Sequence, residues 1–309
     1  MGSEKIKDIC VLLFGFGGLT SLKDIYSFLG SIIGSKPEKA LVEKLTARYK
    51  LIGGSSPLVN ITFKQAKELE KKLKGSGLNL KVFVTMLHGK PSVRDTLIKL
   101  KSENFKSIMT VIMTPYYVPT ITEAYKMALE NTIDNLGLDF NLFYAGPWHI
   151  HPLFLKAVTE NIKKGISKFP EERQDSVEII FTSHSLPQES NGVSSYTEYL
   201  KETIKALHPL PEGHLAFQSQ GSKGIKWLGP SLLTILKRLS KRGVKDILIV
   251  PIGFVSDHLE TLYDLDILAK KEAKSAGINL IRSDSLNASS KFIEALSCII
   301  DEGLEKWQT

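Results

Sequence analysis

Short, wholly apolar runs separated by longer helical patterns constrain the fold of this chain more than any other feature. The apolar runs lie at residues 9–14, 82–86, 107–113, 177–182, 215–218, 247–251 and 278–281. Patterns typical of amphipathic helices lie between them, for example at 40–50, 62–74, 120–130, 231–242 and 291–306. Because strands that are apolar on both faces must be covered on both faces, the pattern predicts an α/β fold with parallel sheets flanked by helices.

Two blocks of the chain repeat one order of features. Residues 82–128 and 215–266 each begin with a strand pattern and continue through a Gly-bearing loop, a helix preceded by proline, a second strand and a second helix. Any two strand–helix–strand units look partly alike, but the shared positions of glycine and proline favour duplication. We therefore predict two Rossmann-like, doubly wound parallel-sheet lobes related by duplication, an N-terminal lobe at 1–147 and a C-terminal lobe at 148–309.

The composition limits the classes of partner. The 309 residues include 40 Lys and Arg against 33 Asp and Glu, a net charge of +7 that suits anionic ligands. The basic residues form no block and no nucleic-acid motif is present, so we expect no nucleic-acid partner. Cys10 and Cys298 are too few for an iron–sulfur cluster, which usually takes four cysteines, and they suit a reducing, cytoplasmic location. No apolar run is long enough to predict a transmembrane helix.

Histidine and acidic residues directly follow two of the predicted strands. His184 follows the run that ends at 182, and Asp257, His258 and Glu260 follow the run that ends at 251. Ligands of parallel α/β sheets bind at the carboxyl ends of the strands, so both groups are expected on one rim of the second lobe. Phe16 and the segment 116–125 are expected on the matching rim of the first lobe, which predicts a cleft between the lobes.

The residue types on the second rim suggest metal or proton chemistry. Asp257, Glu260 and Asp264 have the spacing of residues that share one helix face, where three carboxylates repel one another unless a cation is present. Together with the His184 nitrogen, they suit a divalent transition metal, and the imidazole could also exchange protons. Two structural interpretations compete. Acids in a first helical turn complement the helix dipole, and a single histidine after a strand is commonly structural.

A second pair of histidines lies in the sequence WHIHP. His149 and His151 could share a strand face, but no acidic residue lies near them in the sequence. We therefore favour a structural role for both.

Four segments of the chain, spread over nearly its whole length, resemble ferrochelatases. They are RYKLIGGSSPLVNITFKQAKEL, FTSHSLP, FQSQGSKGIKWLGPSL and VPIGFVSDHLETLYDLDI. The resemblance implies an enzyme of two Rossmann-like lobes that inserts Fe²⁺ into a porphyrin in haem biosynthesis. Fe²⁺ would be a substrate, with no permanently bound cofactor and no obligate protein partner.

The resemblance also assigns site residues. It places the catalytic and metal-site pair on His184 and Glu260, with Asp257, His258 and Asp264 expected to orient that pair. The porphyrin-binding residues expected from the resemblance and from the first rim are Phe16, Arg48, Tyr49, Ser56, Tyr116 and Tyr125. Either His184 or Glu260 could accept the pyrrole protons while the other guides the metal.

The chain departs from the family pattern at three places. Phe16 stands where many members have a tyrosine, and Leu268 stands where many have an acid of an outer metal site. Ile32 and Ile33 stand where the branch that uses coproporphyrin III tends to have arginines. The apolar pair favours the less charged protoporphyrin IX, with coproporphyrin III as the alternative. The apolar segment 25–33 also predicts peripheral membrane contact, with ordinary core burial as the alternative.

Two other functions compete with this interpretation. A cobalt or nickel chelatase acting on a sirohydrochlorin-type tetrapyrrole would share the two-lobed architecture, but such proteins usually rely on paired histidines. A non-catalytic binder of porphyrin or haem would retain the lobes without needing both His184 and Glu260.

Overall fold

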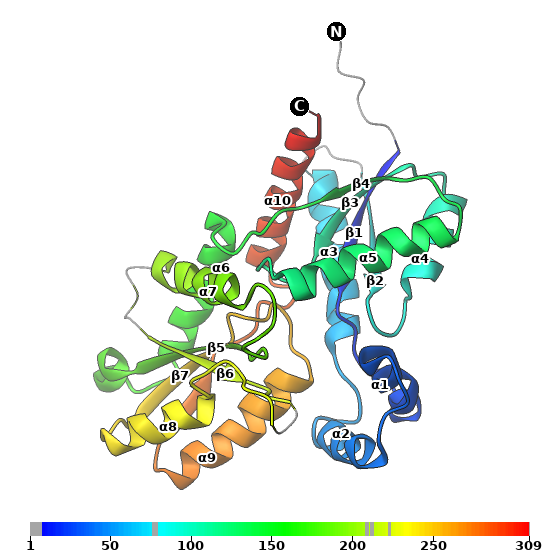
Figure 1. Ribbon diagram of the computed structural model, residues 1–309. Helices are drawn as coiled ribbons and strands as arrows, with labels where there is room; N and C mark the ends of the chain where they lie inside the picture. Colours follow the sequence, from blue (N-terminus) through cyan, green and yellow to red (C-terminus); the bar gives the residue numbers. More distant parts are fainter. Residues whose placement is uncertain (1–7, 76–79, 208–209, 211–212, 222–223, 309) are drawn as a thin grey trace.

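The computed structural model describes residues 8–75, 80–207, 210, 213–221 and 224–308, which form two lobes (Figure 1). Each lobe contains one four-stranded parallel sheet, with the orders β2-β1-β3-β4 and β6-β5-β7-β8. The first sheet consists of β1 (Ile9–Gly15), β2 (Lys81–Met86), β3 (Ser107–Ile112) and β4 (Asn141–Tyr144). The second consists of β5 (Glu178–His184), β6 (His214–Gln218), β7 (Asp246–Val250) and β8 (Asn279–Arg282).

Helices connect the strands in both lobes. In the first lobe they are η1 (Leu22–Asp24), α1 (Ile25–Ile33), α2 (Lys39–Leu51), α3 (Leu58–Gly75), α4 (Val93–Ser102) and α5 (Pro119–Asn135). From α6 onward they are α6 (Pro152–Ile166), η2 (Glu171–Ser176), α7 (Val193–Ala206), α8 (Leu232–Lys241), η3 (Glu260–Ala269), α9 (Lys270–Ser275) and α10 (Ser290–Gln308). The segment η3 is a π-helix that continues into α9.

The two sheets have the same topology, which agrees with the predicted pair of duplicated lobes. In each, the first strand lies between the second and the third, and the fourth lies at the far edge. The order in which strands are added to the sheet therefore reverses between β1 and β3, and again between β5 and β7. Doubly wound sheets bind ligands at such points. The sequence analysis missed β4, in which Asn141 is exposed and Leu142, Phe143 and Tyr144 are partly buried.

The alternation of strand side chains builds separate layers of core. In β1, Val11 and Leu13 face a cluster that includes α3 and α10, whereas Leu12 and Phe14 face α4 and α5. In the second sheet, the Ile247 and Ile249 side chains of β7 face α8, η3 and α9, and Leu248 faces a cluster that includes α6 and α7. Because these strands are buried on both faces, their sequences are continuous apolar runs.

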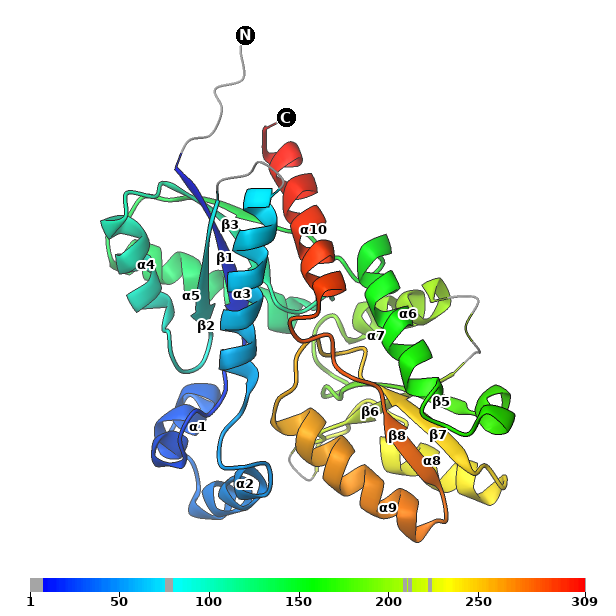
Figure 2. The same cartoon turned by 180° about the vertical axis from the view of Figure 1, so that it is seen from behind.

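Helix α10 lies between the lobes (Figure 2) and packs against both α3 and α6. One buried cluster accordingly contains side chains of both sheets. The predicted boundary at residues 147 and 148 falls in the connection between β4 and α6. The division into an N-terminal and a C-terminal domain remains a prediction, because α10 joins the two lobes.

The helices α1 and α2 form a small cluster of their own. Ile25 and Leu29 of α1 are buried against Tyr49 of α2, and Leu259 of the second lobe packs against this cluster. Tyr26, Ile32 and Ile33 of the same helix remain exposed, and Ile32 and Ile33 continue the face that carries Ile25 and Leu29. Core burial therefore accounts for part of the apolar segment 25–33, and an apolar surface accounts for the rest.

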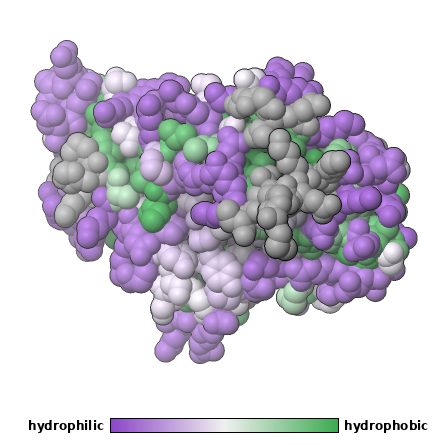
Figure 3. Space-filling model, turned by 90° about the horizontal axis from the view of Figure 1, so that it is seen from above, coloured by the Kyte–Doolittle hydropathy of each residue, from purple (hydrophilic) through white to green (hydrophobic). Residues whose placement is uncertain are grey.

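Two further features concern the surface and the helix lengths. The face seen from the side of the chain termini is mostly hydrophilic, with scattered hydrophobic patches (Figure 3). No helix in the described ranges is both long and apolar enough to span a membrane.

Candidate active site

His184 is the last residue of β5, and its backbone and ring are both held in place. Ser183 Oγ pairs with the Tyr196 hydroxyl, which lies 3.2 Å from the His184 carbonyl oxygen and donates to it. The ring Nδ1 donates to the Ser185 carbonyl, which leaves Nε2 facing Glu260. The distance from His184 Nε2 to Glu260 Oε1 is 3.3 Å.

A glycine lets the segment after β7 approach the end of β5. The Gly253 nitrogen donates to the Thr182 carbonyl at 3.1 Å, and a Cβ atom at Gly253 would lie 2.0 Å from Ser183 Oγ. A side chain at position 253 would therefore push the segment away from β5. This close approach brings Glu260 to His184, as the sequence analysis predicted from the ends of these two strands.

Glu260 begins the π-helix and lies between two histidines. Its second oxygen, Oε2, is 3.7 Å from His258 Nε2 and, among the described residues, has no hydrogen-bond partner although it is buried. π-helical segments are rare in proteins, and those that occur often lie at functional sites. A buried, ionised carboxylate oxygen that has no hydrogen-bond partner among the described residues is suited to binding a metal ion.

The Glu260 carboxylate sets the charge state of His184. Burial lowers the pKa of His184, but attraction to the Glu260 carboxylate and a hydrogen bond to it outweigh burial and raise that pKa to about 9. Burial raises the pKa of Glu260, but His184 and His258 hold it well below its usual range. At neutral pH the pair therefore exists as an imidazolium beside a carboxylate.

Asp264 lies on the same π-helix and connects the pair to the first lobe. Its oxygens accept a hydrogen bond from Ser219 Oγ and form an ion pair with Arg48 Nη1 at 3.8 Å. The Arg48 guanidinium also lies over the Tyr263 ring, 4.8 Å from its centroid. Burial and the Glu260 charge together raise the pKa of Asp264, so it binds a proton more readily than an ordinary aspartate does.

Asp257 does not share a helix face with Glu260 and Asp264, so that prediction is wrong. It precedes the π-helix and pairs with Arg282 Nη1 at 3.1 Å, Ser285 Oγ at 2.7 Å and Asn287 Nδ2 at 2.8 Å. These groups hold its carboxylate toward β8, where Arg282 also binds Asp266. Asp257 therefore anchors the loop that carries His258 and Glu260, and it does not belong to the charge cluster around His184.

Phe16 and Arg48 are the predicted porphyrin contacts that retain accessible side chains in the first lobe. Phe16 is 43% exposed, and its ring contacts His88 with centroids 4.9 Å apart. The neighbouring Gly17 has φ +103°, and a Cβ atom there would lie 1.7 Å from the His88 carbonyl oxygen. The glycine therefore allows the chain to present Phe16 at the carboxyl end of β1.

The remaining predicted porphyrin contacts are at least nine-tenths buried: Tyr49, Ser56, Tyr116 and Tyr125. Tyr125 packs edge-on against Phe14 in the core, and the Tyr116 hydroxyl donates across the lobes to the Ile252 carbonyl at 3.1 Å. The Tyr116 and Tyr125 side chains therefore belong to the packed interior, and their assignment as porphyrin contacts stays a prediction. Tyr49 lies in the cluster against which Leu259 packs, and burial, with the Glu260 charge adding to it, raises its pKa to about 12.

The sequence analysis missed two polar residues at the end of β6. Gln218 Nε2 donates to the Glu260 backbone carbonyl at 3.1 Å, and Ser219 binds Asp264 from a left-handed backbone conformation, with φ 62°. Their signal was present in the sequence FQSQG, which places polar side chains where a parallel strand ends. Both residues fix the start of the π-helix relative to the second sheet.

The amino-acid sequence and the fold were compared with those of known proteins. The ferrochelatase family model matches residues 8–304. The chain is 34% identical to a ferrochelatase of Citrifermentans bemidjiense, over 94% of this chain and 96% of the relative. It is 30% identical to a coproporphyrin III ferrochelatase of Geobacillus, over 95% and 97%. Among solved structures it resembles SirB from Bacillus subtilis with Fe³⁺, with a TM-score of 0.61 at 12% identity over 97% of each chain, a likeness of fold alone. The chain therefore belongs to the ferrochelatase family, whose reaction is the insertion of a metal ion into a porphyrin.

Proposed function

We propose that this enzyme inserts ferrous iron into protoporphyrin IX and that His184 and Glu260 lie at the reacting centre. The observation that carries the proposal is the charge-paired His184 and Glu260 at the carboxyl ends of β5 and β7, with one Glu260 oxygen unpartnered among the described residues. A free-base porphyrin has two N–H protons that must leave before the metal can bind. The site therefore needs a proton acceptor and a metal ligand within reach of one ring.

The charge state of the pair favours Glu260 as the first proton acceptor. Because the pKa of His184 is raised to about 9, its ring already holds a proton at neutral pH and cannot take another. The Glu260 carboxylate is ionised, and its Oε2 has no hydrogen-bond partner among the described residues, although it lies 3.7 Å from His258 Nε2. We therefore assign the first pyrrole proton to Glu260, and we assign to His184 the role of metal guide. The His184 side chain is 36% exposed and releases its proton to solvent as Fe²⁺ arrives.

The surface beside Phe16 favours the less charged porphyrin. The His88 ring contacts Phe16, and the backbone of Ser31 in α1 acts to raise the pKa of His88 against the larger lowering effect of burial. The next two residues, Ile32 and Ile33, are exposed and offer no charge to a carboxylate. A porphyrin with fewer carboxylates therefore loses less hydration free energy when it binds at this end of α1.

Substrate choice can be tested by measuring kcat/KM for protoporphyrin IX and for coproporphyrin III under one set of conditions. We expect the wild-type enzyme to prefer protoporphyrin IX. We expect the double variant Ile32→Arg with Ile33→Arg to move the ratio toward coproporphyrin III by about tenfold, the scale of one charge-assisted hydrogen bond. A wild-type preference for coproporphyrin III would leave the chelatase intact and overturn the substrate assignment.

We further propose that α1 touches a membrane surface from the cytoplasmic side. Tyr26, Ile32 and Ile33 are exposed on this helix, and exposed Lys23 and Lys36 flank it. Apolar side chains with basic neighbours bind best to anionic lipid. In a flotation assay with vesicles rich in anionic lipid, the wild-type chain is expected to float, and the variant Ile32→Glu with Ile33→Glu is expected to remain in solution. Equal recovery of both would contradict the proposal.

We also propose that the reaction needs no iron–sulfur cluster, no bound cofactor and no obligate protein partner. Cys10 is wholly buried in β1, and Cys298 lies on α10, so the cysteines do not form a cluster. The side chains around Glu260 already supply the proton acceptors and the nitrogen that metal exchange requires.

A further inference from the structure

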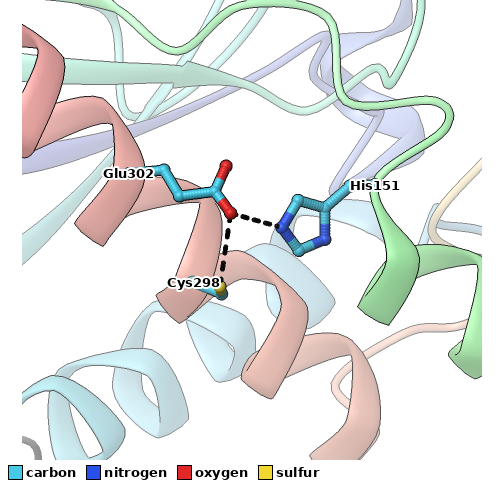
Figure 4. Close-up of side chains that lie close together, drawn as sticks. All are labelled: His151, Cys298 and Glu302. Atoms are coloured by element: carbon cyan, nitrogen blue, oxygen red, sulfur yellow. Dashed lines mark hydrogen bonds and ion pairs between the residues drawn. The ribbon is translucent and has the colours of Figure 1, made fainter.

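A second group of metal-ligand side chains lies between α6 and α10 (Figure 4). Cys298 and Glu302 are four residues apart on α10 and therefore share one face of that helix. His151 is the N-cap residue of α6. One oxygen of Glu302 meets both partners, at 3.3 Å from His151 Nε2 and 3.6 Å from Cys298 Sγ.

The spacing of these atoms matches a tetrahedral metal site. Zinc binds imidazole nitrogen and carboxylate oxygen at about 2.0–2.2 Å and thiolate sulfur at about 2.3 Å, so neighbouring ligand atoms around one ion lie about 3.3–3.8 Å apart. The two distances at Glu302 fall within that range, and all three donor atoms lie within 4.8 Å of one another. A small rearrangement of side chains would place one ion among them.

The surroundings provide one rigid ligand and one route of entry. The His151 side chain is only 9% exposed, and its Nδ1 is buried without a hydrogen-bond partner among the described residues. Because a carboxylate only accepts hydrogen bonds, Nε2 carries the proton in its contact with Glu302. Metal binding at Nε2 therefore requires that proton to leave or to move to Nδ1. Glu302 is half exposed, so an ion can reach the group from solvent.

We propose that His151, Cys298 and Glu302 bind a divalent transition-metal ion of the Zn²⁺ class. A thiolate, an imidazole and a carboxylate form a donor set that such ions favour over Mg²⁺ or Ca²⁺, and three protein ligands leave a fourth position for water. The site joins the start of α6 to α10, the helix that packs against both lobes. Its role is therefore structural, and it is separate from the His184–Glu260 pair carried by β5 and η3.

Cobalt(II) provides a test, because a thiolate bound to Co²⁺ gives a sulfur-to-metal charge-transfer absorption band. The other cysteine of the chain, Cys10, is fully buried, so a band in the folded full-length chain reports Cys298. We expect one equivalent of Co²⁺ to produce the band and Zn²⁺ to abolish it by displacement. The variant Cys298→Ser should lack the band, and Glu302→Gln should weaken it.

Two controls separate this site from the catalytic one. The variant Glu260→Gln should keep the cobalt band, because the proposed ligands are unchanged. Zn²⁺ should raise the thermal midpoint of the wild-type chain more than that of the conservative Cys298→Ser variant, since an ion that binds only the folded state stabilises it. No band in the wild type, or an equal band in Cys298→Ser, would show that the three side chains form only an ion pair with a neighbouring thiol.

Discussion

Replacing Glu260 with glutamine is expected to lower kcat for porphyrin metallation by about 10²–10⁴-fold, the usual contribution of a positioned acid or base. Glutamine keeps the shape of the side chain but removes the charge that accepts the pyrrole proton and attracts Fe²⁺. The measurement is the steady-state rate of metallation, followed by absorbance under anaerobic conditions.

Porphyrin binding separates a chemical defect from a damaged fold. The Glu260→Gln variant should quench porphyrin fluorescence with an affinity comparable to that of the wild type, because the ring contacts belong to other residues. The matched control is Glu272→Gln on α9, the helix that continues the π-helix, and its kcat should be unchanged. Near-wild-type turnover by Glu260→Gln would contradict the assigned role.

The second large effect concerns protonation of His184. In the metal-free wild-type protein its imidazole should titrate at a pKa of about 9. In the Glu260→Gln variant the attracting charge is gone while burial remains, so the pKa should fall well below about 9. The measurement is a pH titration of the His184 ring resonance by NMR, assigned by comparison with a His184→Gln variant.

The same pKa shift predicts the pH dependence of stability. The folded-state pKa of His184 lies above its ordinary value of 6.5, so the stabilisation is fully present below that pH and is lost as pH rises through about 9. The free energy of unfolding should therefore fall over this window in the wild type and change less in Glu260→Gln. Identical curves for the two proteins, or a wild-type His184 pKa near 6.5, would contradict the proposed charge pair.

The fold could be predicted from local sequence patterns, because a strand buried on both faces has an unbroken run of apolar residues. The central strands β1, β3, β5 and β7 were visible as apolar runs, and the repeated order of glycine and proline anticipated two sheets of one topology. The edge strand β4 was missed; it has three consecutive apolar residues, and none of them is fully buried. Likewise, the close approach of His184 and Glu260 followed from the rule that parallel strands end on one rim.

Other features depended on contacts between distant parts of the chain. The three-acid face assumed a helix that included Asp257, whereas Arg282 and Asn287 hold that residue in the preceding loop. Tyr116 and Tyr125 were expected to contact substrate, but tertiary packing buries both rings. His151 was assigned a structural role because no acid lay near it in sequence, and the fold brings Glu302 to it from α10.

The central claim is that this chain loads iron into a porphyrin at the His184–Glu260 pair. Its most direct test is anaerobic mixing of the purified protein with Fe²⁺ and protoporphyrin IX, with absorbance of the metallated ring followed over time against a no-protein control. The account predicts repeated turnover well above the control rate, abolished by Glu260→Gln. Porphyrin that binds but is metallated no faster than in the control, with coproporphyrin III behaving the same way, would contradict the account and identify the protein as a binder.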